Sequence, residues 1–171
     1  TPHSVSGGDS GFAIPTANLV FNDLNFRLAL PELQFIVDDS GASVLCADAR
    51  HWEAATALRY RCPSIRRLVW MDDGPSPDGA PTWDELASHD PAPVPRSLDA
   101  DCVAGITYTG GTTGLPKGVM QTHGNLVVNA KHMLWANPLF ESDRFLHLSP
   151  MFHSAGVANI YAQTLVGGVH V

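Results

Sequence analysis

The sequence Tyr108-Thr-Gly-Gly-Thr-Thr-Gly-Leu-Pro-Lys-Gly118 decides the fold that we expect for the rest of this chain. Glycines let backbone N–H groups turn toward one point and let an anion approach where a Cβ would hinder it. The threonines add hydroxyl donors, and Lys117 adds a full positive charge. The composition of this segment, called the glycine-rich loop below, predicts a phosphate site. Its candidate ligands are Thr109, Gly110, Gly111, Thr112, Thr113, Gly114 and Lys117.

The spacing within the glycine-rich loop excludes two better-known phosphate motifs. A Walker loop needs Gly-Lys followed by Ser or Thr, whereas here Pro116 precedes the lysine and Gly118 follows it. The dinucleotide fingerprint Gly-x-Gly-x-x-Gly is absent as well. A hairpin turn without a ligand is the remaining alternative. The glycines, threonines and lysine directly follow the apolar residues 103–109, and this combination favours the phosphate site.

Composition restricts the classes of function that fit the chain. The 171 residues carry a formal net charge of −7, and 44% of them are hydrophobic. We therefore expect no nucleic-acid partner, because the sequence lacks a basic patch. No apolar run is long enough to cross a bilayer and no signal peptide is visible, so we expect a cytoplasmic protein without a transmembrane segment. Cys46, Cys62 and Cys102 lack Cys-x-x-Cys spacing, which favours reduced thiols in the core.

Strand and helix signals alternate along most of the chain. This alternation predicts an α/β fold with a mainly parallel sheet and flanking helices. Residues 1–16, which are rich in Ser, Gly and Pro, predict a loop or a disordered lead-in. The segments that we expect are strands at 43–47, 67–71, 103–109, 118–122 and 144–149, and helices at 31–41, 48–62, 82–86, 122–137 and 154–165. Prolines at 91–95 predict a surface connection rather than a domain boundary.

Local signals define the ends of these helices. Pro31 suits a first helical turn and Gly41 suits a helix end. Asp48 is the expected cap of the next helix, and Thr82 with Glu85 forms an expected capping box. Either Thr122 or Asn125 caps the helix after the glycine-rich loop, which leaves a strand-loop-strand arrangement around that loop.

Other catalytic and metal-binding patterns are weak in this sequence. No two of the eight histidines show His-x-x-x-His spacing, so we expect no zinc site. Asp72, Asp73 and Asp78 lack the alternating ligands of an EF-hand. Ser154 is not part of a Gly-x-Ser-x-Gly motif, which disfavours a serine hydrolase.

Two motifs in the sequence resemble those of one enzyme family. Residues 106–117 resemble the phosphate-loop signature of adenylate-forming enzymes, which include acyl-CoA synthetases, luciferases and peptide-synthetase adenylation domains, although Gly110 stands where serine is usual. The stretch Pro150-Met-Phe-His-Ser-Ala-Gly156 resembles the family's Pro-x-Phe-His-x-x-Gly segment. Residues from Leu24 onward match more weakly, and residues 1–19 match poorly. The resemblance implies an incomplete N-terminal AMP-binding domain over residues 1–171, with the C-terminal domain absent.

The resemblance also implies a reaction and its cofactors. In that family a carboxylic acid and ATP form an acyl-adenylate and pyrophosphate, and the acyl group then passes to the thiol of CoA. Thr112 is the expected Mg²⁺ ligand, and Phe152, His153 and Gly156 are expected to border the pocket for the small carboxylic acid. Relatives that activate amino acids have aspartate at position 153, so histidine there implies a fatty or aromatic acid. The resemblance does not specify an oligomeric state.

Two other functions remain open at this stage. A non-catalytic nucleotide- or phosphate-binding module would contain the same loop, and a peptide-synthetase adenylation fragment would activate amino acids. No complete catalytic set is recognisable in these 171 residues, because nothing resembles the family's acidic Mg²⁺ ligand, ribose-binding aspartate or C-terminal lysine. We therefore expect an acid-thiol ligase by family, with the isolated chain inactive and poorly soluble.

Overall fold

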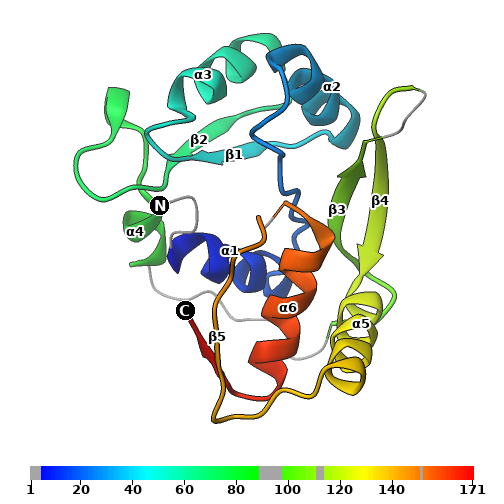
Figure 1. Cartoon of the computed structure of the whole chain (residues 1–171). Coiled ribbons are helices and arrows are strands. Elements are labelled where there is room, and N and C mark those ends of the chain that lie inside the picture. The colour runs from blue at the N-terminus through cyan, green and yellow to red at the C-terminus, as the bar shows by residue number, and fades with distance from the viewer. Residues whose placement is uncertain (1–4, 89–97, 111–113, 151) are drawn as a thin grey trace. The chain divides into compact units, whose positions relative to one another are not determined.

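The computed structural model describes residues 5–88, 98–110, 114–150 and 152–171, without the side chains of residues 5–10. Its contacts divide the chain into two compact units (Figure 1). Unit 1 contains residues 1–23, 94–111 and 117–171, and unit 2 contains residues 24–93 and 112–116. The proline-rich connection predicted at 91–95 lies outside the described residues.

The elements follow one another with alternating helix and strand over much of the chain. The helices are α1 (Val5–Thr16), α2 (Leu30–Ser40), α3 (Trp52–Arg61), the 3-10 helix η1 (Pro77–Gly79), α4 (Trp83–Ala87), α5 (His123–Ala136) and α6 (Ser154–Leu165). The strands are β1 (Val44–Ala47), β2 (Arg67–Trp70), β3 (Val103–Thr109), β4 (Lys117–Thr122), β5 (Arg144–Phe145) and β6 (Val169–His170).

Unit 2 is built on a parallel strand pair that packs against α3, with α2 packed against α3 in turn. The register aligns Val44 of β1 with Arg67 of β2, and α3 connects the two strands. The apolar faces of α2 and α3 meet in one core, because helical spacing places their hydrophobic residues on one side. This core contains Leu33, Val37, Ala47, Ala55, Leu58, Cys62, Ile65 and Leu68.

The local signals at the ends of α2 behave as the sequence predicts. Pro31 lies in the first turn, and Gly41 ends the helix with a φ of 63°. The side chain of Glu32 reaches back, and its Oε2 accepts the backbone N–H of Ala29 at 2.8 Å. The Thr82–Glu85 capping box at the start of α4 is also confirmed, since each side chain accepts the other residue's backbone N–H.

The predicted cap of α3 is wrong. The residue before the helix is His51, which makes no side-chain capping bond. The Oδ1 atom of Asp48 instead accepts the backbone N–H of His51 at 3.0 Å and lies 2.6 Å from Nδ1 of its ring. The carboxylate therefore closes the turn that precedes α3. The expectation of buried thiols is likewise wrong for Cys46, which is exposed, whereas Cys62 is buried.

Unit 1 is organised around the antiparallel hairpin of β3 and β4, whose register shifts between Val103 and Gly105. The strand-loop-strand arrangement is thus confirmed for the described residues. Thr122 ends β4 and caps α5, because its Oγ1 accepts the backbone N–H of Asn125 at 3.1 Å. Helix α5 packs against α6, and its Leu126 joins Phe21 and Ala104 in a small core.

The prediction of a loop or disordered lead-in over residues 1–16 is wrong for its described part, because Val5–Thr16 forms α1. The helix lacks acidic residues in its first turn and has Pro15 near its end, so local signals do not indicate it. Tertiary contacts hold it instead. The hydroxyl of Tyr161 in α6 donates to the carbonyl of Gly11 at 2.8 Å, and its ring lies edge-on to Phe12 with centroids 5.0 Å apart.

The strands pair less extensively than a single parallel sheet would require. The described strands form three two-stranded sheets, of which β1–β2 and β5–β6 are parallel and β3–β4 is antiparallel. The strand expected over 144–149 is confined to Arg144–Phe145. Isolated parallel bridges join Phe21 to Gly105 and Trp70 to Thr82.

The two polar residues that follow the bridge at Phe21, Asn22 and Asp23, are largely shielded from water. The amide nitrogen and oxygen of Asn22 are buried without a hydrogen-bond partner among the described residues. Burial raises the pKa of Asp23 to about 6, because the charged carboxylate loses hydration. Burial raises the pKa of Tyr161 to about 12, and the negative charge of Asp23 is a second, smaller cause of this rise.

We expect Asp23 to make the chain less stable as the pH rises. Its pKa in the folded state lies above the ordinary value of 3.8, so its protonated form stabilises the fold below about pH 4, and this contribution is lost as the pH rises through 6. Urea unfolding between pH 4 and 8 measures the effect. Asp23→Asn should flatten the curve relative to wild type by up to about 3 kcal/mol. The exposed Asp101→Asn is the matched control, and identical curves for both variants would contradict the assignment.

Candidate phosphate loop and acyl-pocket motif

The base of the glycine-rich loop is fixed by the last pair of the β3–β4 ladder. Thr109 lies directly opposite Lys117 in the antiparallel register. Directly opposed residues of such a pair project from the same face of the hairpin. The hydroxyl of Thr109 donates to the carbonyl of Lys117 in a long 3.5 Å contact. A hydroxyl and an ammonium group are thus carried side by side at the entrance of the loop.

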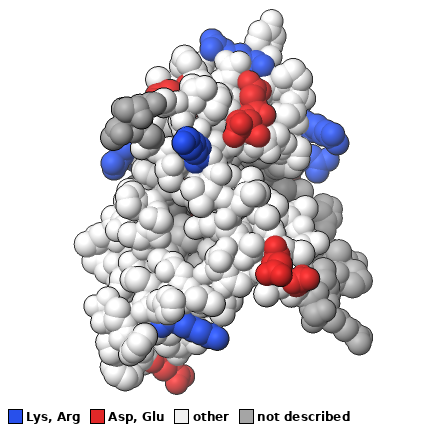
Figure 2. Space-filling view, turned by 90° about the vertical axis from the view of Figure 1, so that its right-hand side faces the viewer, with Lys and Arg blue, Asp and Glu red and all other residues white. Residues whose placement is uncertain are grey.

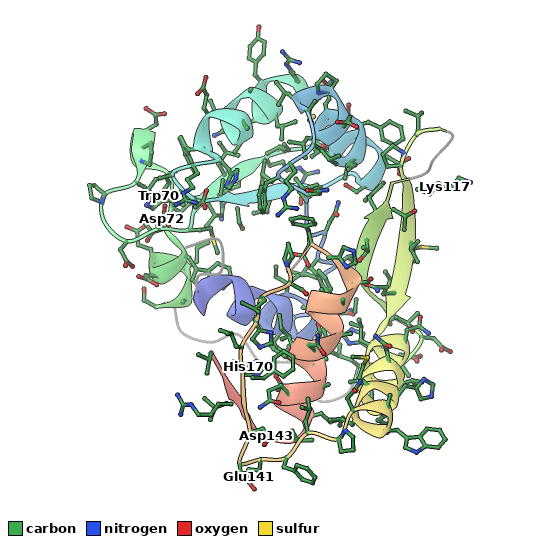
Figure 3. The ribbon with its side chains drawn as sticks, viewed as in Figure 1. Trp70, Asp72, Lys117, Glu141, Asp143 and His170 are labelled. Atoms are coloured by element: carbon green, nitrogen blue, oxygen red, sulfur yellow. The ribbon has the colours of Figure 1, made fainter. Side chains whose placement is uncertain are left out.

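Lys117 carries an available positive charge. Its side chain is exposed at the start of β4, directly after the loop (Figure 3). No ion pair to Lys117 is present among the described residues. Basic and acidic side chains on the face shown in Figure 2 lie in small separate groups. A phosphate group that bound here would therefore be attracted by a local cation and not by a broad basic surface.

The described glycines of the loop leave space for a ligand. A Cβ built on Gly110 or Gly114 would meet no atom of the described residues within 4 Å. Gly114 has a φ of 155°, a backbone conformation that L residues with a side chain rarely adopt. Gly111, Thr112 and Thr113 lie outside the described residues, and their predicted roles therefore stay predictions.

Gly118 shows a tighter environment on the opposite face of the hairpin. A Cβ at this position would lie 3.1 Å from Cζ of Tyr108 and 3.0 Å from Cγ2 of Ile106. Tyr108 is the cross-strand partner of Gly118, so its ring lies over the glycine. A side chain at Gly118 would therefore make Tyr108 and Ile106 shift by a few tenths of an ångström.

The second motif forms a turn that leads into α6. The backbone N–H of His153 donates to the carbonyl of Pro150 at 3.0 Å. His153 then caps α6, and its Nδ1 accepts the backbone N–H of Ala155 at 3.4 Å. Because Nδ1 acts as an acceptor, the neutral imidazole carries its proton on Nε2. The side chain of His153 is exposed and that of Phe152 is half-buried.

Gly156 is the residue at which the start of α6 packs against the backbone of Pro150. It is buried in the first turn of α6, and a Cβ there would approach the carbonyl oxygen of Pro150 to 2.5 Å. A side chain would therefore force the turn away from the helix. Gly156 shapes the segment through its backbone, whereas the predicted pocket roles of Phe152 and His153 depend on side chains and stay predictions.

Sequence reasoning missed Gln163, the buried polar residue of α6. Its Nε2 donates to the carbonyls of Asp143 at 2.9 Å and of Val169 at 3.4 Å. A Cβ on Gly168 would collide with this amide group. One side chain thus joins α6 to the segments that form β5 and β6. A glutamine within an otherwise apolar helical pattern is the only sequence signal of this role.

One cavity of unit 1 lies apart from the predicted site residues. It has a volume of about 110 Å³ and is lined in part by Phe12, Leu126 and Tyr161. His123 also lines it, and its buried Nε2 has no hydrogen-bond partner among the described residues. None of the predicted ligand residues contributes to this lining.

Comparison with known proteins identifies the family. A family model described as AMP-binding enzyme matches residues 10–171. The chain belongs to this family. The family resemblance that the two motifs indicate is thereby confirmed. Within the described residues, no group of three or more metal-ligating side chains is present, and no helix has the length and apolar character needed to span a membrane.

Individual relatives give the same assignment. The chain is 38% identical over 157 residues to a feruloyl-CoA synthase of Amycolatopsis, covering 92% of the chain and 29% of the relative. It is 34% identical to a long-chain-fatty-acid–CoA ligase of Thermus thermophilus, covering 94% of the chain and 29% of the relative. The chain spans less than a third of the length of these two relatives.

A solved structure agrees with this fold. The structure of ATP-bound MatB from Rhodopseudomonas palustris matches with a TM-score of 0.81 at 25% identity, covering 99% of this chain and 33% of that protein. The predicted α/β fold class, as part of an adenylate-forming enzyme domain, is confirmed.

We expect Gly156→Ala to destabilise the chain. The added methyl group would meet the Pro150 carbonyl at 2.5 Å, so the turn must open, at a cost of roughly 1–3 kcal/mol. Urea unfolding measures the loss. Gly11→Ala is the matched control, because a Cβ on Gly11 meets nothing within 4 Å and alanine favours a helix. Equal stability of Gly156→Ala and wild type would contradict the steric argument.

Proposed function

We propose that this chain is the ATP-phosphate-binding part of an ATP-dependent carboxylate–CoA ligase. The observation that carries the proposal is the pairing of Thr109 with Lys117 at the base of the glycine-rich loop. Family membership and the names of the relatives, which include CoA ligases, support it. The loop would hold the β- and γ-phosphates of ATP.

The proposed reaction has two balanced steps. A carboxylate oxygen of the acid attacks the α-phosphorus of ATP, the bond to the bridging oxygen breaks, and pyrophosphate leaves. The CoA thiol then attacks the acyl carbon as the thiolate, and AMP leaves with the electron pair of the broken C–O bond. The first step needs no general base, because a carboxylic acid with a pKa near ~4 is already ionised at pH 7.

The chain's own residues would act on the departing pyrophosphate. Charge builds up on the β- and γ-phosphates as the bond breaks, and donors already aimed at that charge stabilise the transition state. Lys117 supplies a cation, Thr109 a hydroxyl, and the loop glycines supply backbone amides. The space around Gly110 and Gly114 fits an approaching phosphate. Thr112 offers the hydroxyl oxygen that suits Mg²⁺, and the bound ion would neutralise phosphate charge.

The Pro150–Gly156 segment supports a fatty or aromatic acid as substrate. His153 presents an exposed imidazole, and its Nε2 carries the proton in the neutral form. A neutral imidazole offers no counter-charge for the ammonium group of an amino acid. Phe152 and His153 would border the acyl group. We also propose that the protein works in the cytoplasm, where ATP and CoA are available.

We infer that these residues do not complete the reaction alone. The chain corresponds to 29% of the length of the feruloyl-CoA synthase and of the fatty-acid ligase. No residue of the chain is assigned to CoA or to the adenosine of ATP. The predicted inactivity of the isolated chain therefore stays a prediction, as does the absence of a C-terminal domain.

We expect Lys117→Ala to weaken ATP handling. Loss of one charge-assisted contact to phosphate costs on the order of 1.5–3 kcal/mol, or roughly 10- to 150-fold in kcat/KM for ATP. The measurement is pyrophosphate release by the full-length protein. Lys131→Ala removes the chain's other lysine from the exposed face of α5 and should leave the rate unchanged. Equal rates for both variants would exclude Lys117 from phosphate binding.

A substrate panel tests the proposed acid class. The full-length protein should release pyrophosphate with fatty or aryl acids and form their CoA thioesters, while amino acids should give background rates. The isolated 171 residues should give no exchange of pyrophosphate into ATP. Preferred activation of amino acids would instead indicate a peptide-synthetase adenylation domain. Binding of ATP without turnover of any acid by the full-length protein would indicate a non-catalytic nucleotide-binding module.

A further inference from the structure

A side-chain hydrogen bond crosses the hairpin of β3 and β4 in unit 1. The hydroxyl of Thr107 in β3 donates to Oε1 of Gln121 in β4 at 3.1 Å. Both side chains are half-buried. The two residues are diagonal neighbours in the ladder, because Thr107 pairs with Val119 and Gln121 pairs with Gly105. A long side chain such as that of glutamine reaches a diagonal partner of this kind.

Gly105 makes room for this hydrogen bond. It stands directly opposite Gln121 and has no side chain that would compete for the space between the strands. A Cβ on Gly105 would lie 2.6 Å from Cζ of Phe21, so the ring of Phe21 fills the place of the missing side chain. The side chain of Gln121 extends from there toward the glycine-rich loop and reaches Thr107.

The hydrogen-bonded pair lies on the same face of the hairpin as Thr109 and Lys117. Residues an even number apart on a strand point to the same side, which places Thr107 with Thr109 and Gln121 with Lys117. At about 3.4 Å per residue, Gln121 lies roughly 14 Å along β4 from Lys117 and cannot touch a phosphate group at the base of the loop. The hydroxyl proton of Thr107 is already donated to Gln121. The pair can therefore affect a bound phosphate only through the position of Lys117.

Side-chain contacts must select the register of this hairpin. If the strands slip by two residues, every side chain keeps its face and the backbone hydrogen-bond pattern repeats, so the backbone does not oppose the slip. Two contacts are specific to the observed register. On one face the ring of Tyr108 lies over Gly118, and on the other Thr107 donates to Gln121. The second contact is the one on the face that carries the candidate phosphate ligands.

We propose that Thr107 and Gln121 are positioning residues that hold Lys117 opposite Thr109 at the base of the glycine-rich loop. This role rests on the proposed binding of ATP phosphates by Lys117. While the hydrogen bond is made, the ammonium group of Lys117 and the hydroxyl of Thr109 stay side by side. Without it, β4 also populates slipped or frayed pairings in which the ammonium group is displaced. A displaced cation binds the phosphates and stabilises the departing pyrophosphate less well.

Pyrophosphate release by the full-length protein at varied ATP concentration tests the proposal. Thr107→Val removes the donor and keeps the shape, and Gln121→Met keeps the length and removes the acceptor. Each should lower kcat/KM for ATP roughly three- to tenfold through a higher KM for ATP, while KM for the acid stays unchanged. Thr107→Ser keeps the donor and should restore the wild-type value. Thr164→Val, which loses the hydroxyl bond to the carbonyl of Ile160 in α6, is the matched control and should handle ATP as wild type.

A double-mutant cycle with Lys117→Ala separates positioning from a loss of folded protein. If Thr107 acts through Lys117, Thr107→Val should cause no further loss of kcat/KM for ATP in the Lys117→Ala protein, whereas a general structural defect would add its full factor. A full additional loss would overturn the proposal, as would an unchanged KM for ATP in Thr107→Val and Gln121→Met. If one of these variants fails to fold, the other decides by the same criteria. An unchanged kcat/KM for ATP in Lys117→Ala alone would instead overturn the proposed phosphate binding itself.

Discussion

The antiparallel register between β3 and β4 is the constraint on which the candidate site depends. A slip of one residue would move every side chain of β4 to the opposite face of the hairpin. In the observed register Lys117 stands opposite Thr109, and Gly118 lies under the ring of Tyr108. The loop between the strands is thereby given a cation and a hydroxyl at its base. The proposed phosphate recognition would depend on strand pairing, because neither group belongs to a helix end.

The same hairpin also positions α5. Thr122 is both the last residue of β4 and the cap of the helix, so strand and helix are joined without a linker. The backbone N–H groups of His123 and Gly124 donate to the carbonyls of Cys102 and Ala100, which precede β3. These bonds attach the start of α5 to the other strand of the hairpin. Helix, strands and loop base are consequently connected by hydrogen bonds within unit 1.

The sequence predicted those features that depend on neighbouring residues. Pro31 and Gly41 mark the ends of α2, and the Thr82–Glu85 box marks the start of α4, because each signal acts within one turn. The same local rules failed for α1, which is stabilised by Tyr161, 150 residues from Gly11. They failed for Asp48 because its carboxylate closes a turn that the sequence pattern does not distinguish from a helix cap.

For the candidate site, too, the sequence predicted only those features that depend on neighbouring residues. The glycine-rich loop is contiguous in sequence, so its composition and position after a strand were sufficient to predict it as a site. The contact between His147 and His170 joins residues 23 apart, and the hydrogen bonds of Gln163 require the packing of α6. No spacing rule within one helix detects such contacts.

The close approach of Gly156 to Pro150 has a consequence for protein engineering. Because the backbone itself occupies the space beside Gly156, every side chain at this position would push the turn open, and library members that vary it would begin from a less stable fold. Phe152 and His153 belong to the same turn, and no such backbone contact is found for them. Under the proposed function, a change of acid preference is therefore best sought by randomising these two side chains while the proline and the glycine are kept.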